Sequence, residues 1–344
     1  MTDFWIPRRT LLKGSAAALG TAALTTSPIS SAFGAKFPSN PLSVMVATRE
    51  GGGADRNLRA FWSVWKKYLK TRMEASFYPG AAGRVGYEKY MGIAKPDCYT
   101  LLFGNMGPEI LNWVVSPPRG FKYPGDYVYF NQIDADPGII FVDNKRSKIK
   151  TIDDLVKLGK KRPLKVGVSR VAHPATLGIL ALGKERGFGV NVIPLSGGKN
   201  TRNGVKSGEM DCGALPAGGI VRRWKNFRIL AHFDNREIGG SLGKRMYNAP
   251  SVNKHFGTNF PALIAGARAF AIKAEAIKKH PDRFKILEDT ARKVFDDPDF
   301  EKNYKKTKAP WELIKYGDRA ACEQYHKDIW AVGSQFKDLM KGKA

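Results

Sequence analysis

Hydrophobic and polar residues follow one another in an order that predicts alternating strands and helices. Alternating and β-branched positions from Leu42 to Thr48 predict a strand. Asp55 can cap the helix after it, in which apolar residues recur at spacings of three and four. These apolar positions are Leu58, Phe61, Trp62, Trp65 and Leu69. Strands at Ala75–Tyr78 and Tyr99–Phe103, with a helix between them, complete a β-α-β-α-β order, which is typical of a mainly parallel sheet flanked by helices.

The same order returns in the second half of the chain. It follows a connection rich in proline and glycine over residues 115–126. The expected strands are Gly138–Val142, Leu164–Val168, Val190–Pro194, Cys212–Leu215 and Arg228–Phe233. A block rich in helices comes after Pro261, which suggests that the chain returns to cover its first part. We therefore predict an α/β protein of two lobes, with residues 35–134 and 263–344 in lobe 1 and residues 135–262 in lobe 2.

Residues 1–34 have the pattern of an export signal. Arg8-Arg9 stand before Thr10-Leu11-Leu12-Lys13, an apolar stretch covers residues 14–24, and small residues surround residues 32–35. A twin arginine before a short apolar segment is typical of twin-arginine export. We expect cleavage near Gly34-Ala35 and a periplasmic location for the remainder. A disordered tail or an amphipathic anchor is the alternative interpretation.

Charge narrows the possible partners only in part. The chain of 344 residues carries a formal charge of +26. Its lysines and arginines are dispersed, without a basic block interleaved with aromatic residues, so we expect no nucleic acid as a partner. Attraction to anionic solutes, attraction to a membrane surface and adaptation to the medium all remain open. No apolar run reaches the ~18–20 residues that span a bilayer.

Cysteines and histidines indicate neither a metal site nor a redox motif. Cys98, Cys212 and Cys322 are widely spaced, and an odd number in an exported protein allows at most one disulfide. The five histidines are scattered, and none has another at the spacing of metal ligands. We therefore expect no metal and no cofactor.

Two turns that contain glycine or small residues run from a predicted strand into a predicted helix. The first covers Val46–Arg56 and the second covers Val166–Thr176. A helix start carries unpaired N–H groups and a partial positive charge, and glycine lets a ligand approach the backbone closely. Such turns readily hold an anionic group. One turn in each lobe predicts a pocket that closes on a small molecule bearing a carboxylate.

The motifs around these turns resemble the substrate-binding component of tripartite tricarboxylate transporters, also called the Bug family. G-G-G-A-D-R-N-L-R is similar to that family's G-G-G-x-D-x-x-A-R turn, and Y-P-G-A-A-G-R-V-G to its R-P-G-A-G-G-x-x-G turn. K-P-D-C-Y-T-L-L, I-P-L-S-G-G and S-G-E-M-D match further motifs in the same order. The segments are Gly51–Arg59, Tyr78–Gly86, Lys95–Leu102, Ile193–Gly198 and Ser207–Asp211. The resemblance implies a type II periplasmic-binding fold, a carboxylated ligand held by loop amides, and delivery to integral membrane permease subunits.

The turns and the resemblance together give a set of expected ligand-binding residues. Hydroxyl groups and Arg170 in the second turn can hold a carboxylate, while Asp211 could accept from an amine or hydroxyl of the ligand. Met106 follows a strand at its carboxyl end, where open α/β sheets bind ligands. The full set is Thr48, Arg49, Glu50, Gly51, Gly52, Gly53, Asp55, Met106, Ser169, Arg170, His173, Thr176 and Asp211.

Several positions depart from the family's motifs. Ala47-Thr48-Arg49-Glu50 stands where the family has proline, an aromatic residue and two variable positions, and Thr176 stands near the family's histidine. An acidic Glu50 would repel a carboxylate unless Arg49 or Arg170 offsets it, or it could receive an amine. The fold is therefore expected to carry over, while the identity of the ligand does not follow.

Enzyme motifs do not emerge from the sequence. It has no G-x-S-x-G elbow, P-loop, H-E-x-x-H or recognisable Cys–His pair. We expect a monomeric receptor that is not an enzyme. A periplasmic hydrolase or lyase acting on a small organic acid, or a ligand sensor without a transport role, is the alternative.

Overall fold

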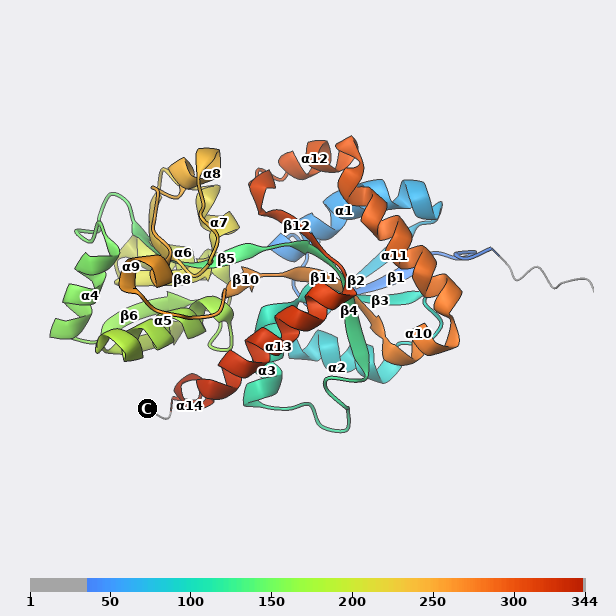
Figure 1. The fold of residues 1–344 in the computed structure, drawn as a ribbon, viewed down its shortest axis with the longest axis horizontal. Coiled ribbons are helices and arrows are strands. Elements are labelled where there is room, and N and C mark those ends of the chain that lie inside the picture. Colours follow the sequence, from blue (N-terminus) through green and yellow to red (C-terminus); the bar gives the residue numbers. More distant parts are fainter. Residues whose placement is uncertain (1–35, 343–344) are drawn as a thin grey trace, which may run out of the picture. The chain divides into compact units, whose positions relative to one another are not determined.

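The computed structural model describes residues 36–342 and contains two six-stranded sheets with helices packed around each (Figure 1). The expected export signal at residues 1–34 and its cleavage near Gly34-Ala35 lie outside the described residues. Between residues 36 and 342, no helix combines the length and apolar character needed to cross a membrane.

The first sheet is built from both ends of the chain. Its strand order is β12-β4-β11-β3-β1-β2, with β1 parallel to β2 and β3, and with β11 antiparallel between β3 and β4. The strands are β1 (Leu42–Val46), β2 (Met73–Phe77), β3 (Thr100–Asn105), β4 (Tyr127–Asp134), β11 (Arg268–Lys273) and β12 (Ile314–Gly317). The helices around it are α1 (Gly53–Leu69), η1 (Ala81–Gly83), α2 (Arg84–Ile93), α3 (Met106–Val115), α10 (Ala274–Lys279), α11 (Pro281–Asp296), α12 (Pro298–Lys305), η2 (Trp311–Leu313), α13 (Arg319–Gln335) and α14 (Lys337–Met340).

The second sheet is formed by the middle of the chain. Its order is β10-β5-β8-β6-β7, and β9 pairs with β5 as well. The strands are β5 (Asp136–Asp143), β6 (Leu164–Val168), β7 (Val190–Pro194), β8 (Cys212–Pro216), β9 (Phe227–His232) and β10 (Ile264–Gly266). Its helices are α4 (Ile152–Lys161), α5 (Pro174–Arg186), α6 (Gly198–Ser207), α7 (Ala217–Val221), α8 (Gly240–Arg245) and α9 (Val252–Phe256).

The backbone passes between the two sheets at two places. Ala135 joins β4 to β5, and Ala267 joins β10 to β11. The second passage comes after β10, which pairs with β5. The lobe bounds expected after residue 134 and at Leu263 stay a prediction.

A buried ion network joins the two passages. Arg268 forms an ion pair with Asp134, which also accepts from the Arg268 backbone N–H at 2.8 Å and from Asn57 Nδ2 at 2.8 Å. Arg268 Nη2 lies 3.8 Å from Asp136 Oδ2, and Gly218 N–H donates to Asp136 Oδ1 at 2.8 Å. Burial raises the pKa of Asp136 to about 7, an effect that the charge of Arg268 opposes. The network fixes both passages against the first turns of α1 and α7.

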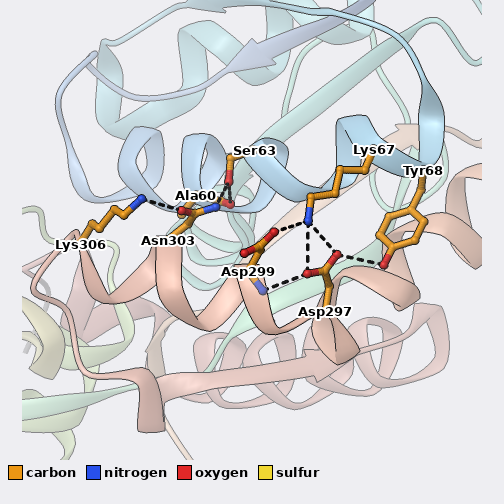
Figure 2. A network of polar contacts seen from close by, with 8 residues as sticks. All are labelled: Ala60, Ser63, Lys67, Tyr68, Asp297, Asp299, Asn303 and Lys306. Carbon is orange, nitrogen blue, oxygen red and sulfur yellow. Dashed lines mark hydrogen bonds and ion pairs between the residues drawn. The ribbon is translucent and has the colours of Figure 1, made fainter.

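Helix α1 is held along its length by the face that its periodicity predicted. Phe61 and Trp65 lie in the core with their rings edge to face at 5.5 Å, and both pack on Phe270 of β11. On the other side, Lys67 of α1 forms ion pairs with Asp297 and Asp299 at the start of α12 (Figure 2). The packing positions the amino end of α1 at the carboxyl edge of the sheet.

A carboxyl group lies inside the aromatic core under α3. Glu109 is buried, Trp113 Nε1 donates to its Oε1 at 2.6 Å, and the Tyr129 hydroxyl donates to its Oε2 at 2.9 Å. Burial raises the pKa of Glu109 to about 8, although the two donors act in the opposite direction. The group is therefore neutral at pH 7 in the folded protein.

Candidate functional site

The carboxyl edges of the parallel strands in the two sheets are in contact. Arg170, after β6, donates from Nη1 to the carbonyl oxygen of Ala82, after β2, at 2.6 Å. The first turns of α3 and α5 also meet, since a Cβ built at Gly107 would lie 2.6 Å from Pro174 Cγ. The turns expected to bind a ligand therefore lie on edges that approach each other, where open α/β sheets commonly bind ligands.

The first turn is fixed by Asp55. Its Oδ2 accepts from the Gly51 N–H at 2.7 Å, and its Oδ1 accepts from Arg59 Nε at 2.7 Å. Gly51 has a φ of 71°, a left-handed conformation that glycine adopts without strain. The carboxylate of Asp55 is thus used within the turn. The N–H groups of Gly53, Ala54 and Asp55 head α1 without intrahelical acceptors and remain available for an anion.

Arg49 and Glu50 lie at the exposed rim of this turn. The Glu50 carboxylate accepts from Arg59 Nη2 at 2.8 Å, and both side chains are more than half exposed. Arg49 is exposed, and its carbonyl accepts from the Gly52 N–H at 3.3 Å. The negative charge of Glu50 is therefore offset by Arg59, which removes the need for Arg49 or Arg170 to do so.

The second turn positions Arg170 and caps α5. Thr176 is fully buried, and its hydroxyl donates to the Arg170 carbonyl at 2.9 Å. His173 is buried, and its Nδ1 accepts from the Ala175 N–H at 3.2 Å as the N-cap of α5. Burial, together with the charges of Arg170 and Arg268, lowers the pKa of His173 well below its usual range. Its ring is therefore neutral, with the proton on Nε2, where it can donate.

Two buried oxygen atoms at the edge of the first sheet have no hydrogen-bond partner among the described residues. They are Thr48 Oγ1, just after β1, and Asn105 Oδ1, at the end of the neighbouring parallel strand β3. A buried acceptor without a donor costs free energy, so each such atom calls for an explanation. A ligand that donates or bridges here would satisfy both. Sequence reasoning missed Asn105, although its place at the carboxyl end of β3 was a usable indication.

Met106 and Asp211 have structural roles, and Asp211 lies away from this edge contact. Met106 is fully buried, and its N–H donates to the Ala267 carbonyl at 2.9 Å. Asp211 lies at the amino end of β8. Its carboxylate accepts hydrogen bonds from both terminal nitrogens of Arg162, at 2.8 and 2.6 Å. Because β6 and β8 are parallel, Asp211 lies at the opposite end of the sheet from Ser169 and Arg170. The structure therefore separates Asp211 from the other candidates.

Four arginines that sequence reasoning did not single out gather beside the first turn. Arg56 comes from α1, Arg202 from α6, and Arg222 and Arg223 from the end of α7. All four are half-buried, and none has a carboxylate within 4.0 Å among residues 36–342. Burial, followed by the charges of Arg223, Arg222 and Arg56, lowers the pKa of Arg202 to about 10. Only the fold brings these side chains together, because they come from three separate elements.

The rest of the described chain offers no metal centre. Within residues 36–342, no three His, Cys, Asp or Glu side chains are grouped so as to hold a metal ion. Cys98, Cys212 and Cys322 are buried free thiols, and burial raises the pKa of Cys322 to about 12. The chemistry that this edge offers is thus the binding of anions and hydrogen-bonding groups.

The chain is similar to solved structures, while comparisons of its sequence find no match. No protein-family model and no curated protein matches the chain. Among similar solved structures, a TctC solute-binding protein from Polaromonas has a TM-score of 0.68 and 18% identity, over 90% of this chain and 100% of its own. An adipate-bound protein of R. palustris has a TM-score of 0.70 and 16% identity, over 89% and 98%. MatC from Rhodopseudomonas palustris, with bound malate, has a TM-score of 0.67 and 14% identity, over 88% of this chain and 100% of its own.

These likenesses span nearly the whole described chain. A periplasmic binding protein called BugD is also similar, with a TM-score of 0.66 and 16% identity. The comparison thus returns the group of proteins whose motifs the sequence resembled. At this level of identity the likeness establishes the architecture, and the chain has the two-lobed type II periplasmic-binding fold.

Proposed function

We propose that this protein is an exported receptor that captures a small carboxylate between its two sheets and releases it unchanged to a transporter. One observation carries the proposal. Arg170 is half-buried between the two sheets, has no carboxylate partner among the described residues, and lies beside the capped start of α5. A guanidinium group in that setting is suited to a carboxylate, which it can bind with two parallel hydrogen bonds.

The surrounding groups define how such a ligand would be held. The free N–H groups at the start of α1 can bind one carboxylate oxygen, and the Ser169 hydroxyl and His173 Nε2 can donate from the opposite edge. Arg170 would exchange its bond to the Ala82 carbonyl for one to the ligand. The nearby Thr48 and Asn105 oxygens can accept from a hydroxyl of the ligand or from a bridging water.

Adipate and malate in two similar structures support the choice of a small organic acid as the ligand class. A ligand that contacts both edges stabilises the arrangement in which they approach, so binding would shift an equilibrium between separated and apposed sheets. The passages at Ala135 and Ala267 are where the chain would bend. The export signal, a periplasmic location, a monomeric state and docking to integral membrane permease subunits belong to the same proposal.

A thermal-shift screen tests the proposal. Mono-, di- and tricarboxylates, aromatic acids and amino acids are added to the purified protein at millimolar concentration. A bound ligand raises the unfolding midpoint by several degrees, because at 100 times Kd it stabilises the fold by about 2.7 kcal/mol. The ligand must also be recovered chemically intact, which distinguishes a receptor from a hydrolase or lyase. No shift with any of these acids contradicts the proposal.

A further inference from the structure

We propose that the four arginines Arg56, Arg202, Arg222 and Arg223 form a second anion-binding subsite, so that the ligand carries at least two separated anionic groups. The inference rests on the proposed function, in which Arg170 holds the first carboxylate. It goes further by assigning a site to three arginines outside the two predicted turns, together with Arg56 at the end of the first, and by restricting the ligand to dianions or more highly charged acids.

The arginines converge from both sheets on the same place. Arg202 Nη1 would lie 3.2 Å from a Cβ at Gly198 and 3.5 Å from one at Gly219, so its guanidinium group rests over the backbone of α6 and α7. Arg223 Nη1 donates to the Gly219 carbonyl at 3.1 Å, beside Arg202. A Cβ at Gly198 would crowd the Arg202 guanidinium group, whereas one at Gly219 would be in ordinary van der Waals contact with it.

Arg56 brings the first sheet to the same cluster. Its Nη1 donates to the Gly51 carbonyl at 2.7 Å, which directs the side chain along the first turn. Its pKa is lowered by burial and then by the charges of Arg268 and Arg223. Arg222 is affected in the same way by burial, Arg56 and Arg223, and its Nε is buried without a hydrogen-bond partner in the described chain. Arg56 of α1 thus interacts electrostatically with Arg222 and Arg223, which follow α7.

No carboxylate of residues 36–342 lies within 4.0 Å of these arginines, which distinguishes the cluster from the ion network of Arg268. Arg268 is buried against Asp134 and Asp136, which compensate its charge. The four clustered arginines repel one another, and partial burial deprives them of water. The Asp55 carboxylate offsets part of the charge of Arg56. A mobile anion is the missing counter-charge, and an oxyanion suits the planar donors of guanidinium groups.

Two chemical kinds of ligand meet this requirement. One is a dicarboxylate or tricarboxylate, with its second carboxylate at the cluster. The other is a carboxylic acid with a phosphate or phosphonate group there. Half-buried arginines on three elements and both sheets suit a compact molecule better than a flat polyanionic surface, whose contacts would be exposed.

Calorimetric titration of matched ligands tests the subsite. Glutarate and 3-phosphonopropionate each carry a second anionic group that butyrate lacks. We expect butyrate to bind the native protein at least 10-fold more weakly than the better of the two dianions.

Arg202→Gln and Arg223→Gln should each weaken binding of the dianion about 10- to 100-fold and binding of butyrate less than 3-fold. Arg170→Ala should weaken both classes. Arg228→Gln, a half-buried arginine over the Tyr247 ring, is the matched control and should change neither.

The outcomes separate the subsite from the receptor proposal. If butyrate binds as tightly as the dianions, or Arg202→Gln weakens both equally, the subsite is wrong and the receptor stands. If no acid binds, the receptor proposal fails, and inorganic phosphate then decides on the subsite. At equal ionic strength, phosphate rather than chloride should raise the unfolding midpoint of the native protein and leave that of the Arg202→Gln, Arg223→Gln double variant unchanged. Equal shifts in both proteins overturn the subsite.

Discussion

Replacing Arg268 by methionine is expected to lower the free energy of unfolding by about 3–5 kcal/mol, because it leaves two buried carboxylates without their cation. Asp134 and Asp136 expose only 0% and 2% of their surface, so water cannot take the place of the guanidinium group. Methionine keeps much of the volume of the side chain, and the loss therefore reports on charge rather than on packing. The same change should loosen both passages between the sheets.

Urea denaturation at pH 7.5 measures the loss. Arg292→Met is the matched control, since Arg292 pairs with Asp296 on the surface and its removal should cost at most about 1 kcal/mol. Adding Asp134→Asn and Asp136→Asn to Arg268→Met should recover part of the stability, because no buried charge then remains. Equal effects of Arg268→Met and Arg292→Met would show that the network is not a determinant of the fold.

The buried carboxyl of Glu109 should make stability fall as pH rises. Its folded pKa of about 8 lies above the ordinary glutamate value of 4.5, which the unfolded chain approaches. Below the unfolded pKa both states hold the proton, and the contribution of the neutral group is fully present. Between the two values the unfolded state ionises first, so stability falls by up to ~1.4 kcal/mol per pH unit until the folded pKa is passed. The total amounts to about 4–5 kcal/mol at pH 9.

Glu109→Gln isolates this term. Glutamine has nearly the same shape and does not ionise; its amide oxygen can accept from Trp113 Nε1, and its amide nitrogen can donate to the Tyr129 hydroxyl. Unfolding free energies are measured by urea for both proteins at pH 5 and pH 9. We expect the unfolding free energy of the native protein to fall by at least about 3 kcal/mol relative to the variant between pH 5 and pH 9. This is less than the total of about 4–5 kcal/mol because part of the loss occurs below pH 5. Asp136 is common to both proteins and cancels in the difference. Parallel pH profiles would mean that Glu109 is already ionised in its aromatic pocket.

Much of the fold followed from periodicity, and the misses have physical causes. The apolar face of α1 and the strands of both parallel runs lie close to where the pattern placed them. Helix α3 was missed because it is buried nearly all round and therefore shows no polar face. Strand β4 and strand β12 pair with strands that come much later or earlier in the chain, a relation that local sequence does not reveal.

The candidate site was predictable as far as it is local. The two turns and the position of Arg170 depend on residues near one another in sequence. The expectation that Asp55 caps α1 was wrong, because Gly52 is the N-cap and Asp55 accepts from the Gly51 N–H from within the first turn of the helix. Asp211 and Glu50 each pair with an arginine, and local sequence does not reveal such pairing because it depends on strand register or helix geometry. The arginine cluster was missed for the converse reason. Its members are ordinary dispersed basic residues until three elements bring them together.

The central claim is that a carboxylate binds between the carboxyl edges of the two sheets, and a crystal structure of the complex tests it most directly. The protein is crystallised with the acid that gives the largest thermal shift. We predict density for one carboxylate between the N–H groups of Gly53–Asp55 and the guanidinium group of Arg170. Density elsewhere, for example in the surface depression around Arg236 and Lys254, with the contact between Arg170 and Ala82 unchanged, would contradict the account.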